Sequence, residues 1–127
     1  MAGITIATRD GPPTTIAEET VEAFRRRLRG PLLVPEDDGF EEATRLWNGM
    51  IEATPTLVVR PTGTADVVAA VDFARERDLS LSVKGGGHNI AGTALVDRGL
   101  TVDMSRLRGV LVDPRERTVT AQAGCRL

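Results

Sequence analysis

The stretch SVKGGGHNIAG, residues 82–92, holds the backbone and side-chain groups of this sequence that are best suited to bind or attack a ligand. Three consecutive glycines at 85–87 precede His88, the single histidine of the chain. Glycines adopt positive φ freely and lack a Cβ, so their backbone can approach a bound group closely. Consecutive N–H groups in such a loop form a nest for anions. With Lys84 at its start, the loop predicts a site for a diphosphate.

Two common phosphate-binding motifs do not fit this loop. A G-x-G-x-x-G fingerprint starting at Gly85 needs a glycine where Ile90 stands, and it should follow a first strand and open a helix. Residues 87–93 have the G-x4-G frame of a P-loop, but Thr93 occupies the position of the lysine that reaches the phosphates. Glycine turns also connect strands without binding anything, so a flexible connection remains the alternative to an anion nest.

His88 adds a group that can act as a nucleophile or move a proton. A lone histidine can equally be an ordinary surface residue. No second histidine lies in the chain and Cys125 is the only cysteine, so neither a metal centre nor an internal disulfide is expected.

Three elements are expected to position the loop. A β-branched apolar run at 56–61, a helix over 64–78 and a strand over 79–86 follow one another within about 30 residues. This order predicts a βαβ unit with parallel strands and a right-handed crossover. The helix is expected to turn four residues inward: Val67, Val68, Val71 and Ala74.

Beyond residue 95 the pattern becomes rich in strands. A strand and turn are expected at 99–107, with Asp103 stabilising the turn or simply capping the strand. Residues 109–124 read as a β-hairpin whose turn is DPRER, at 113–117. The chain stops just after this hairpin, which predicts a fragment of a longer protein.

The N-terminal third reads as a short edge strand or loose leader followed by helices. Thr15 and Glu18 match a capping box, which predicts a helix over 14–30 that ends at Gly30. Its apolar stripe consists of Ile16, Val21, Phe24 and Leu28. A second, short helix is expected with Asp38 as its cap, Gly49 at its end, and one apolar face made by Phe40, Ala43 and Trp47.

Composition limits the partners. The formal net charge of the chain is −2, with 27% charged and 41% apolar residues. No basic excess is present to neutralise phosphates, so neither nucleic acid nor an anionic membrane is expected as a partner. The sequence has no secretory pattern and no apolar run near the ~18 residues of a membrane span. Together with the single cysteine, this predicts a cytoplasmic location.

Three motifs, KGGGHNIAG at 84–92, VDMSRL at 102–107 and AQAGC at 121–125, together resemble a known family. The chain from about residue 28 onward is similar to the first half of the FAD-binding PCMH-type domain of the vanillyl-alcohol-oxidase superfamily, and most similar to bacterial berberine-bridge-enzyme-like FAD-linked oxidases. The resemblance implies an α+β fold, with a βαβ subdomain followed by the start of a truncated β-rich subdomain. It divides the chain into a helical entry segment, 1–54, and the first part of the FAD-binding domain, 55–127.

The resemblance also implies roles for particular residues. The pyrophosphate of FAD is expected on the glycine loop, and the histidine at the position of His88 often carries the flavin through an 8α-N-histidyl bond. Cys125 occupies a turn position usually filled by alanine, so it is expected near the cofactor but not bonded to it. The implied FAD-binding residues are Lys84, Gly85, Gly86, Gly87, His88, Asn89 and Gly92.

The implied activity is oxidation of an alcohol, sugar or secondary metabolite by hydride transfer to the flavin. The small-molecule substrate and the catalytic base would belong to the full-length protein, and no catalytic residue is assigned in this chain, which has no tyrosine. Two alternatives remain: an inert truncated fragment or interaction module, and a general nucleotide-phosphate binder without flavin preference.

Overall fold

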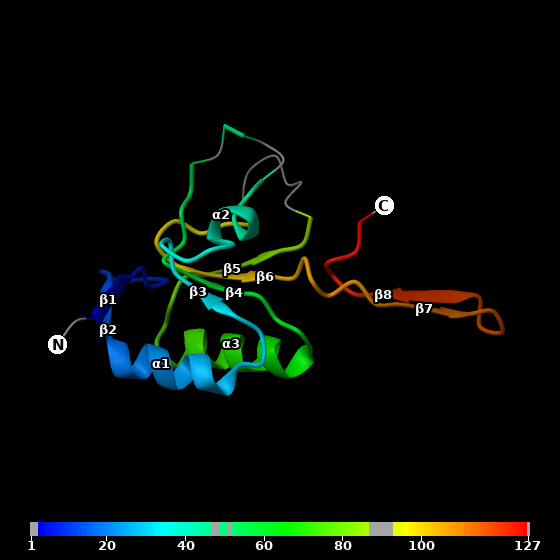
Figure 1. The fold of residues 1–127 in the computed structure, drawn as a ribbon, viewed down its shortest axis with the longest axis horizontal. Coiled ribbons are helices and arrows are strands. Elements are labelled where there is room, and N and C mark those ends of the chain that lie inside the picture. The colour runs from blue at the N-terminus through cyan, green and yellow to red at the C-terminus, as the bar shows by residue number, and fades with distance from the viewer. Residues whose placement is uncertain (1–2, 47–48, 51, 87–92, 127) are drawn as a thin grey trace.

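A four-stranded sheet forms the centre of the protein, with helices on both faces (Figure 1). The computed structural model describes residues 3–46, 49–50, 52–86 and 93–126. The strand order is β3-β4-β6-β5. The strands are β3 (Leu32–Leu33), β4 (Leu57–Val59), β6 (Leu100–Asp103) and β5 (Leu81–Lys84). Helices α1 (Glu18–Arg27) and α3 (Thr64–Glu76) cover one face, and the short α2 (Phe40–Ala43) lies over the other. The mixed α and β content agrees with the expected fold class.

Strand direction confirms the βαβ unit, but the neighbours differ from the simplest form of it. β4 and β5 both pair in parallel with β6, and so run in the same direction on either side of it. β3 pairs antiparallel with β4. The two strands of the βαβ unit are therefore parallel without being adjacent, because a later strand is inserted between them.

The sheet is covered on both faces, as its short apolar strands require, except at Val83 of the edge strand β5, which is 55% exposed. Leu57 and Val59 pack with the residues of the main core, whereas Val58 packs with Leu33, Phe40 and Ala43 beneath α2. This alternation follows the two-residue period of a strand. Odd and even positions of one strand therefore serve different layers.

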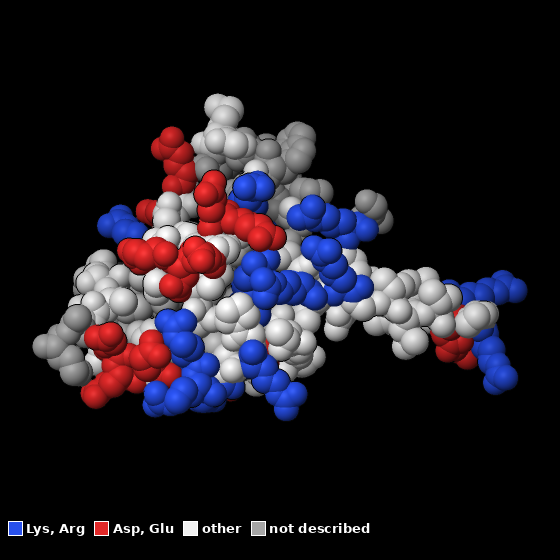
Figure 2. Space-filling view, viewed as in Figure 1, with Lys and Arg blue, Asp and Glu red and all other residues white. Residues whose placement is uncertain are grey.

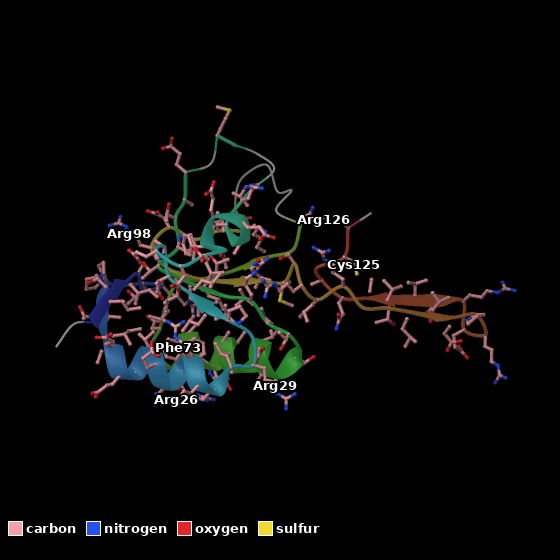
Figure 3. All side chains as sticks on the ribbon, in the orientation of Figure 1. Arg26, Arg29, Phe73, Arg98, Cys125 and Arg126 are labelled. Carbon is pink, nitrogen blue, oxygen red and sulfur yellow. The ribbon has the colours of Figure 1, made fainter. Side chains whose placement is uncertain are left out.

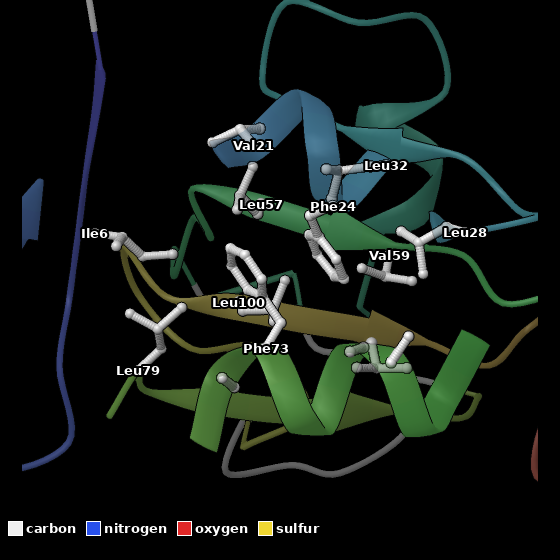
Figure 4. Packing of buried hydrophobic residues seen from close by; sticks show 14 of the residues in the cluster. Ile6, Val21, Phe24, Leu28, Leu32, Leu57, Val59, Phe73, Leu79 and Leu100 are labelled. Atoms are coloured by element: carbon white, nitrogen blue, oxygen red, sulfur yellow. The ribbon is translucent and has the colours of Figure 1, made fainter. Parts of the chain in front are cut away.

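The main core lies between the sheet and the two longer helices (Figure 4). Phe24 of α1 and Phe73 of α3 stack with ring centroids 4.0 Å apart and an interplanar angle of 7°. Arg77 covers Phe73 from outside, with its guanidinium carbon 4.0 Å from the ring centroid. Among the described residues, no helix is both long and apolar enough to cross a membrane.

The expected inward face of α3 is wrong for two of its four residues. Val68 and Val71 are 53% and 41% exposed. Val67 is half-buried, and only Ala74 is fully buried as predicted. The buried face consists of Asp66, Ala69, Ala70, Phe73 and Ala74. The small alanines let the helix approach the sheet closely, and Phe73 fills the remaining space in the core. The helix therefore turns its alanine face to the sheet and leaves Val68 and Val71 exposed.

The capping box predicted for the first helix is also wrong. Thr15 lies in β2 (Thr14–Ala17), which pairs antiparallel with β1 (Gly3–Ile6), so the edge strand is confirmed. α1 begins at Glu18, and its N-cap makes no side-chain hydrogen bond. The backbone of residues 14–17 pairs with β1, so Thr15 is extended and cannot cap the helix. The helix ends at Arg27 with Leu28 as its C-cap, so Gly30 is not its C-cap.

The second helix is shorter than predicted and begins differently. Its N-cap is Gly39, at φ 88°, so the predicted cap Asp38 is wrong. α2 ends at Ala43, well before Gly49. Phe40 and Ala43 are buried as predicted, and Trp47 lies outside the described residues.

The predicted hairpin is confirmed as β7 (Val110–Asp113) and β8 (Thr118–Ala121). Asp113 closes its turn by accepting hydrogen bonds from the N–H groups of Arg115 and Glu116, at 3.0 and 3.1 Å. The hairpin projects from the body as an arm (Figure 1). Every residue of its strands is exposed, so it contributes nothing to the core.

Asp66, at the start of α3, ties its own segment to the backbone of residues 29–30, which are distant in sequence. Its carboxylate accepts hydrogen bonds from the N–H groups of Arg29, Gly30 and Thr62 at 2.9–3.0 Å, and from the Thr62 hydroxyl at 3.3 Å. A Cβ at Gly30 would lie 2.0 Å from the Arg60 carbonyl oxygen, so only glycine allows this approach. Burial alone would raise the pKa of Asp66, but these hydrogen bonds outweigh it and hold the pKa below its usual value.

Asp66→Asn is expected to lower the free energy of unfolding by about 1–3 kcal/mol near neutral pH, because an amide cannot satisfy four donors. Since the folded-state pKa is depressed, the stabilisation is complete above the unfolded-state pKa and disappears as the pH falls through the folded-state pKa. Urea unfolding of both proteins should therefore show a gap that narrows below about pH 4. Asp72→Asn, which removes a surface carboxylate from the same helix, is the control and should change stability by less than about 0.5 kcal/mol. An equal effect of the two substitutions would contradict the role of Asp66.

Candidate functional site

Three charged residues lie at the carboxyl ends of three neighbouring parallel strands. Arg60 follows β4, Asp103 ends β6 and Lys84 ends β5. Lys84 is the register partner of Asp103, and Arg60 lies one residue beyond the Val59–Val102 pair. The three side chains thus form one row across the sheet, on the face that carries α2. In open parallel sheets, ligands bind outside this carboxyl edge.

The row is buried. Asp103 is fully buried, and Arg60 and Lys84 are each 3% exposed. Asp103 Oδ2 lies 3.0 Å from Arg60 Nε, an ion pair without the geometry of a hydrogen bond. Asp103 Oδ1 accepts from Lys84 Nζ at 3.4 Å. We name this row of Arg60, Asp103 and Lys84 the charge row.

Ser105 completes the coordination of the carboxylate. Its N–H donates to Asp103 Oδ1 at 3.1 Å and its hydroxyl donates to Oδ2 at 3.0 Å. Arg60 Nη2 donates to the same hydroxyl at 3.3 Å. Asp103 therefore stabilises the turn after β6, which is one of the two roles that the sequence left open. It also joins two other strands, which no sequence pattern indicated.

A cavity of about 360 Å³ lies beside the charge row. Among the described residues, its lining contains four cationic side chains and one carboxylate. Figure 2 shows basic side chains gathered on this face near the base of the β7–β8 arm. The lining residues are Glu42, Arg45, Leu46, Lys84, Gly86, Arg108 and Arg126. This charge balance favours an anionic ligand.

The start of the glycine loop lies at this cavity. Gly86 is part of the lining, and a Cβ at Gly85 would lie 2.9 Å from the carbonyl oxygen of Ala123. The loop and the segment after the hairpin therefore approach each other too closely for a larger residue. Lys84 reaches the cavity while its amine is held by Asp103. The other predicted site residues, Gly87, His88, Asn89 and Gly92, lie outside the described residues.

Cys125 lies in the turn that follows the hairpin, as predicted (Figure 3). Its N–H donates to the carbonyl oxygen of Gln122 at 3.0 Å, and its half-buried thiol donates to that of Gly109 at 3.6 Å. The turn brings the neighbouring Arg126 to the cavity.

Sequence reasoning missed Arg45, Arg60, Arg108 and Arg126 as site residues. Arg45 and Arg126 lie far from the glycine loop in sequence, and only the folded chain gathers them. Arg60 comes directly after an apolar strand in the sequence. That position is the one sequence signal for a residue at the carboxyl edge of the sheet.

A cationic cavity and glycines at the carboxyl edge of a mainly parallel sheet are features of a nucleotide-binding domain, here within an α+β fold. The cavity fits the diphosphate of a dinucleotide cofactor, because cationic side chains and a close glycine backbone both favour it. The family model for an FAD binding domain matches residues 55–127. The chain belongs to this family, and its resemblance to the PCMH-type domain of the vanillyl-alcohol-oxidase superfamily is confirmed.

Individual relatives agree with this assignment. The chain is 34% identical over 93 residues to an FAD-linked oxidoreductase, hasG, of Aspergillus fumigatus, covering 73% of this chain and 20% of that protein. It is 31% identical over 86 residues to (R)-6-hydroxynicotine oxidase of Paenarthrobacter nicotinovorans, covering 68% and 19%. The crystal structure of 6-hydroxy-D-nicotine oxidase from Arthrobacter nicotinovorans superposes with a TM-score of 0.72 at 28% identity, covering 77% and 22%. The chain thus spans about a fifth of the length of these relatives.

Gly85→Ala is expected to displace the glycine loop from Ala123 and lower the free energy of unfolding by about 1–3 kcal/mol through overpacking. Gly49→Ala is the matched control, since a Cβ there meets nothing within 4 Å, and it should stay within about 0.5 kcal/mol of the parent. Urea unfolding of the three proteins measures both effects. Equal stability of the two variants would show that the loop does not need its close approach.

Proposed function

We propose that this chain holds the adenosine diphosphate side of FAD in an FAD-dependent oxidoreductase. The observation that carries the proposal is the cationic cavity at the carboxyl edge of the sheet, lined by Gly86 and Lys84. Backbone N–H groups of the glycine loop would bind the diphosphate. Arg45, Arg108 and Arg126 would balance its charge.

The whole protein is proposed to oxidise an alcohol, sugar or secondary metabolite. When bound, the flavin supplies the acceptor for a hydride, and the chain positions it. This chain's own contribution is binding and orientation. Two relatives, an FAD-linked oxidoreductase and (R)-6-hydroxynicotine oxidase, support this reaction class. A cytoplasmic location and the absence of nucleic-acid and membrane partners belong to the same proposal, on the grounds of composition.

His88 is proposed to tether the flavin covalently through its imidazole. It follows the cavity-lining Gly86 by two positions in the sequence. Its nucleophilic nitrogen and the family resemblance support this role. Its contribution would be to retain and tune the cofactor, while acid–base work would fall to residues of the full-length protein.

FAD binding tests the cavity. Titration calorimetry of the 127-residue chain should show FAD binding that Arg126→Glu weakens about tenfold or more, because a cation beside a diphosphate becomes a repelling anion. Arg115→Glu makes the same change of charge at the exposed tip of the hairpin and should leave the affinity unchanged. Equal binding of ATP and FAD would support a general nucleotide-phosphate binder instead. A chain that takes up no added FAD would contradict the proposal for this chain and support the inert fragment.

The tether has its own test. After incubation with FAD, denaturation and electrophoresis, the chain should give a band with flavin fluorescence. His88→Ala should lose the fluorescent band while the protein still binds FAD reversibly. Fluorescence that survives in His88→Ala would place the attachment elsewhere, and a dark band in the parent chain would show that binding is non-covalent.

A further inference from the structure

The charge row contains two cations and one carboxylate, so it carries a formal surplus of one positive charge inside the protein. Buried charges are costly unless they are paired. The Asp103 carboxylate is shared between Arg60 Nε at 3.0 Å and Lys84 Nζ at 3.4 Å. Asp103 lies closer to Arg60 than to Lys84, although Arg60 Nε has no hydrogen-bond partner. The bond from Lys84 exceeds the 2.7–2.9 Å that is usual for charge-assisted N–H···O bonds, so the charge of Lys84 is only partly compensated.

No other carboxylate among the described residues balances this surplus from within the protein. Glu42 Oε1 lies 3.7 Å from Arg60 Nη2, but its side chain is 71% exposed. Such a contact is screened by water and contributes little. Lys84 has three donors, and among the described residues its one hydrogen bond is the long one to Asp103. The surplus charge therefore faces the cavity that Lys84 lines.

We propose that Arg60 is a positioning residue for the bound diphosphate and acts through Asp103. By occupying Oδ2, Arg60 withdraws the carboxylate from Lys84 and leaves the lysine charge available to an anion in the cavity. Arg60 itself does not line the cavity. The inference rests on the proposed function, since it concerns the same cavity. It adds a buried residue, two strands away from the glycine loop, that sets anion affinity.

Arg60→Met tests this inference, with inorganic pyrophosphate as the probe. The substitution keeps an unbranched side chain, removes the positive charge and leaves a balanced Lys84–Asp103 pair. Pyrophosphate affinity is expected to fall about three- to tenfold, although the altered side chain does not touch the ligand. The rise in melting temperature that pyrophosphate causes should be smaller in Arg60→Met than in the parent chain, whatever the substitution does to the stability of the ligand-free chain. Arg60→Lys, which keeps the charge, should restore most of the affinity.

Arg98→Met is the matched control. Arg98 is 77% exposed, pairs with Asp97 and precedes β6 at the opposite edge of the sheet. The same chemical change there should leave pyrophosphate affinity unaltered. Unchanged affinity in a folded Arg60→Met, or an equal loss in Arg98→Met, would overturn the inference.

Asp103→Asn is the second variant, in case Arg60→Met does not fold. It removes the carboxylate and raises the surplus to two positive charges. Melting temperatures measured over a range of pyrophosphate concentrations should show a lower value without ligand and a larger rise with ligand than in the parent chain. A rise equal to or smaller than the parent's would overturn the inference.

The outcomes separate this inference from the proposed function. If the parent chain prefers FAD but Arg60→Met has no effect, the proposed function is supported and the inference about Arg60 is contradicted. If pyrophosphate binding depends on Arg60 but the parent chain shows no preference for FAD, the inference is supported and the flavin assignment is contradicted.

Discussion

The carboxylate of Asp103 holds the functional edge of the sheet together. It is fully buried at the end of the central strand β6 and contacts cations that follow β4 and end β5. Parallel strands cannot be joined by tight turns. Here an ionic contact between side chains links the ends of three of them, and the glycine loop starts directly after its lysine. The place where the chain approaches a ligand is therefore set by an interaction between strands.

A second buried carboxylate, Asp66, fixes the other side of the same strand end. It accepts hydrogen bonds from the N–H groups of Thr62, two residues after Arg60, and of Gly30, which approaches the carbonyl oxygen of Arg60 closely. One carboxylate thus positions the main chain near Arg60 and the other positions its guanidinium. Removing one partner of a buried ion pair leaves an uncompensated charge, which is far more costly than losing a surface pair. The contacts of Asp66 and Asp103 thus hold cationic side chains in place at the carboxyl edge of the sheet.

The accuracy of the sequence-based predictions depended on the range of the interactions involved. The hairpin at 109–124 was predictable because Asp113 organises its turn from within. The βαβ unit was predictable from periodicity, and strand direction followed. The capping box at Thr15 and Glu18 failed because pairing with β1 took the backbone of residues 14–17. The inward face of α3 failed because hydrophobicity favoured its valines, whereas close packing favoured alanines and Phe73.

By itself, the sequence determined the family and the position of the glycine loop in the chain, because these depend on residue type and local spacing. Only the tertiary structure placed β6 between β4 and β5. That insertion brings Asp103 between Arg60 and Lys84, more than 40 positions and 19 positions away in the chain. The fold also gathers Arg45, Arg108 and Arg126 at the cavity that Gly86 lines. A cationic site assembled across strands leaves no local pattern, since each residue acquires its role from neighbours that are distant in sequence.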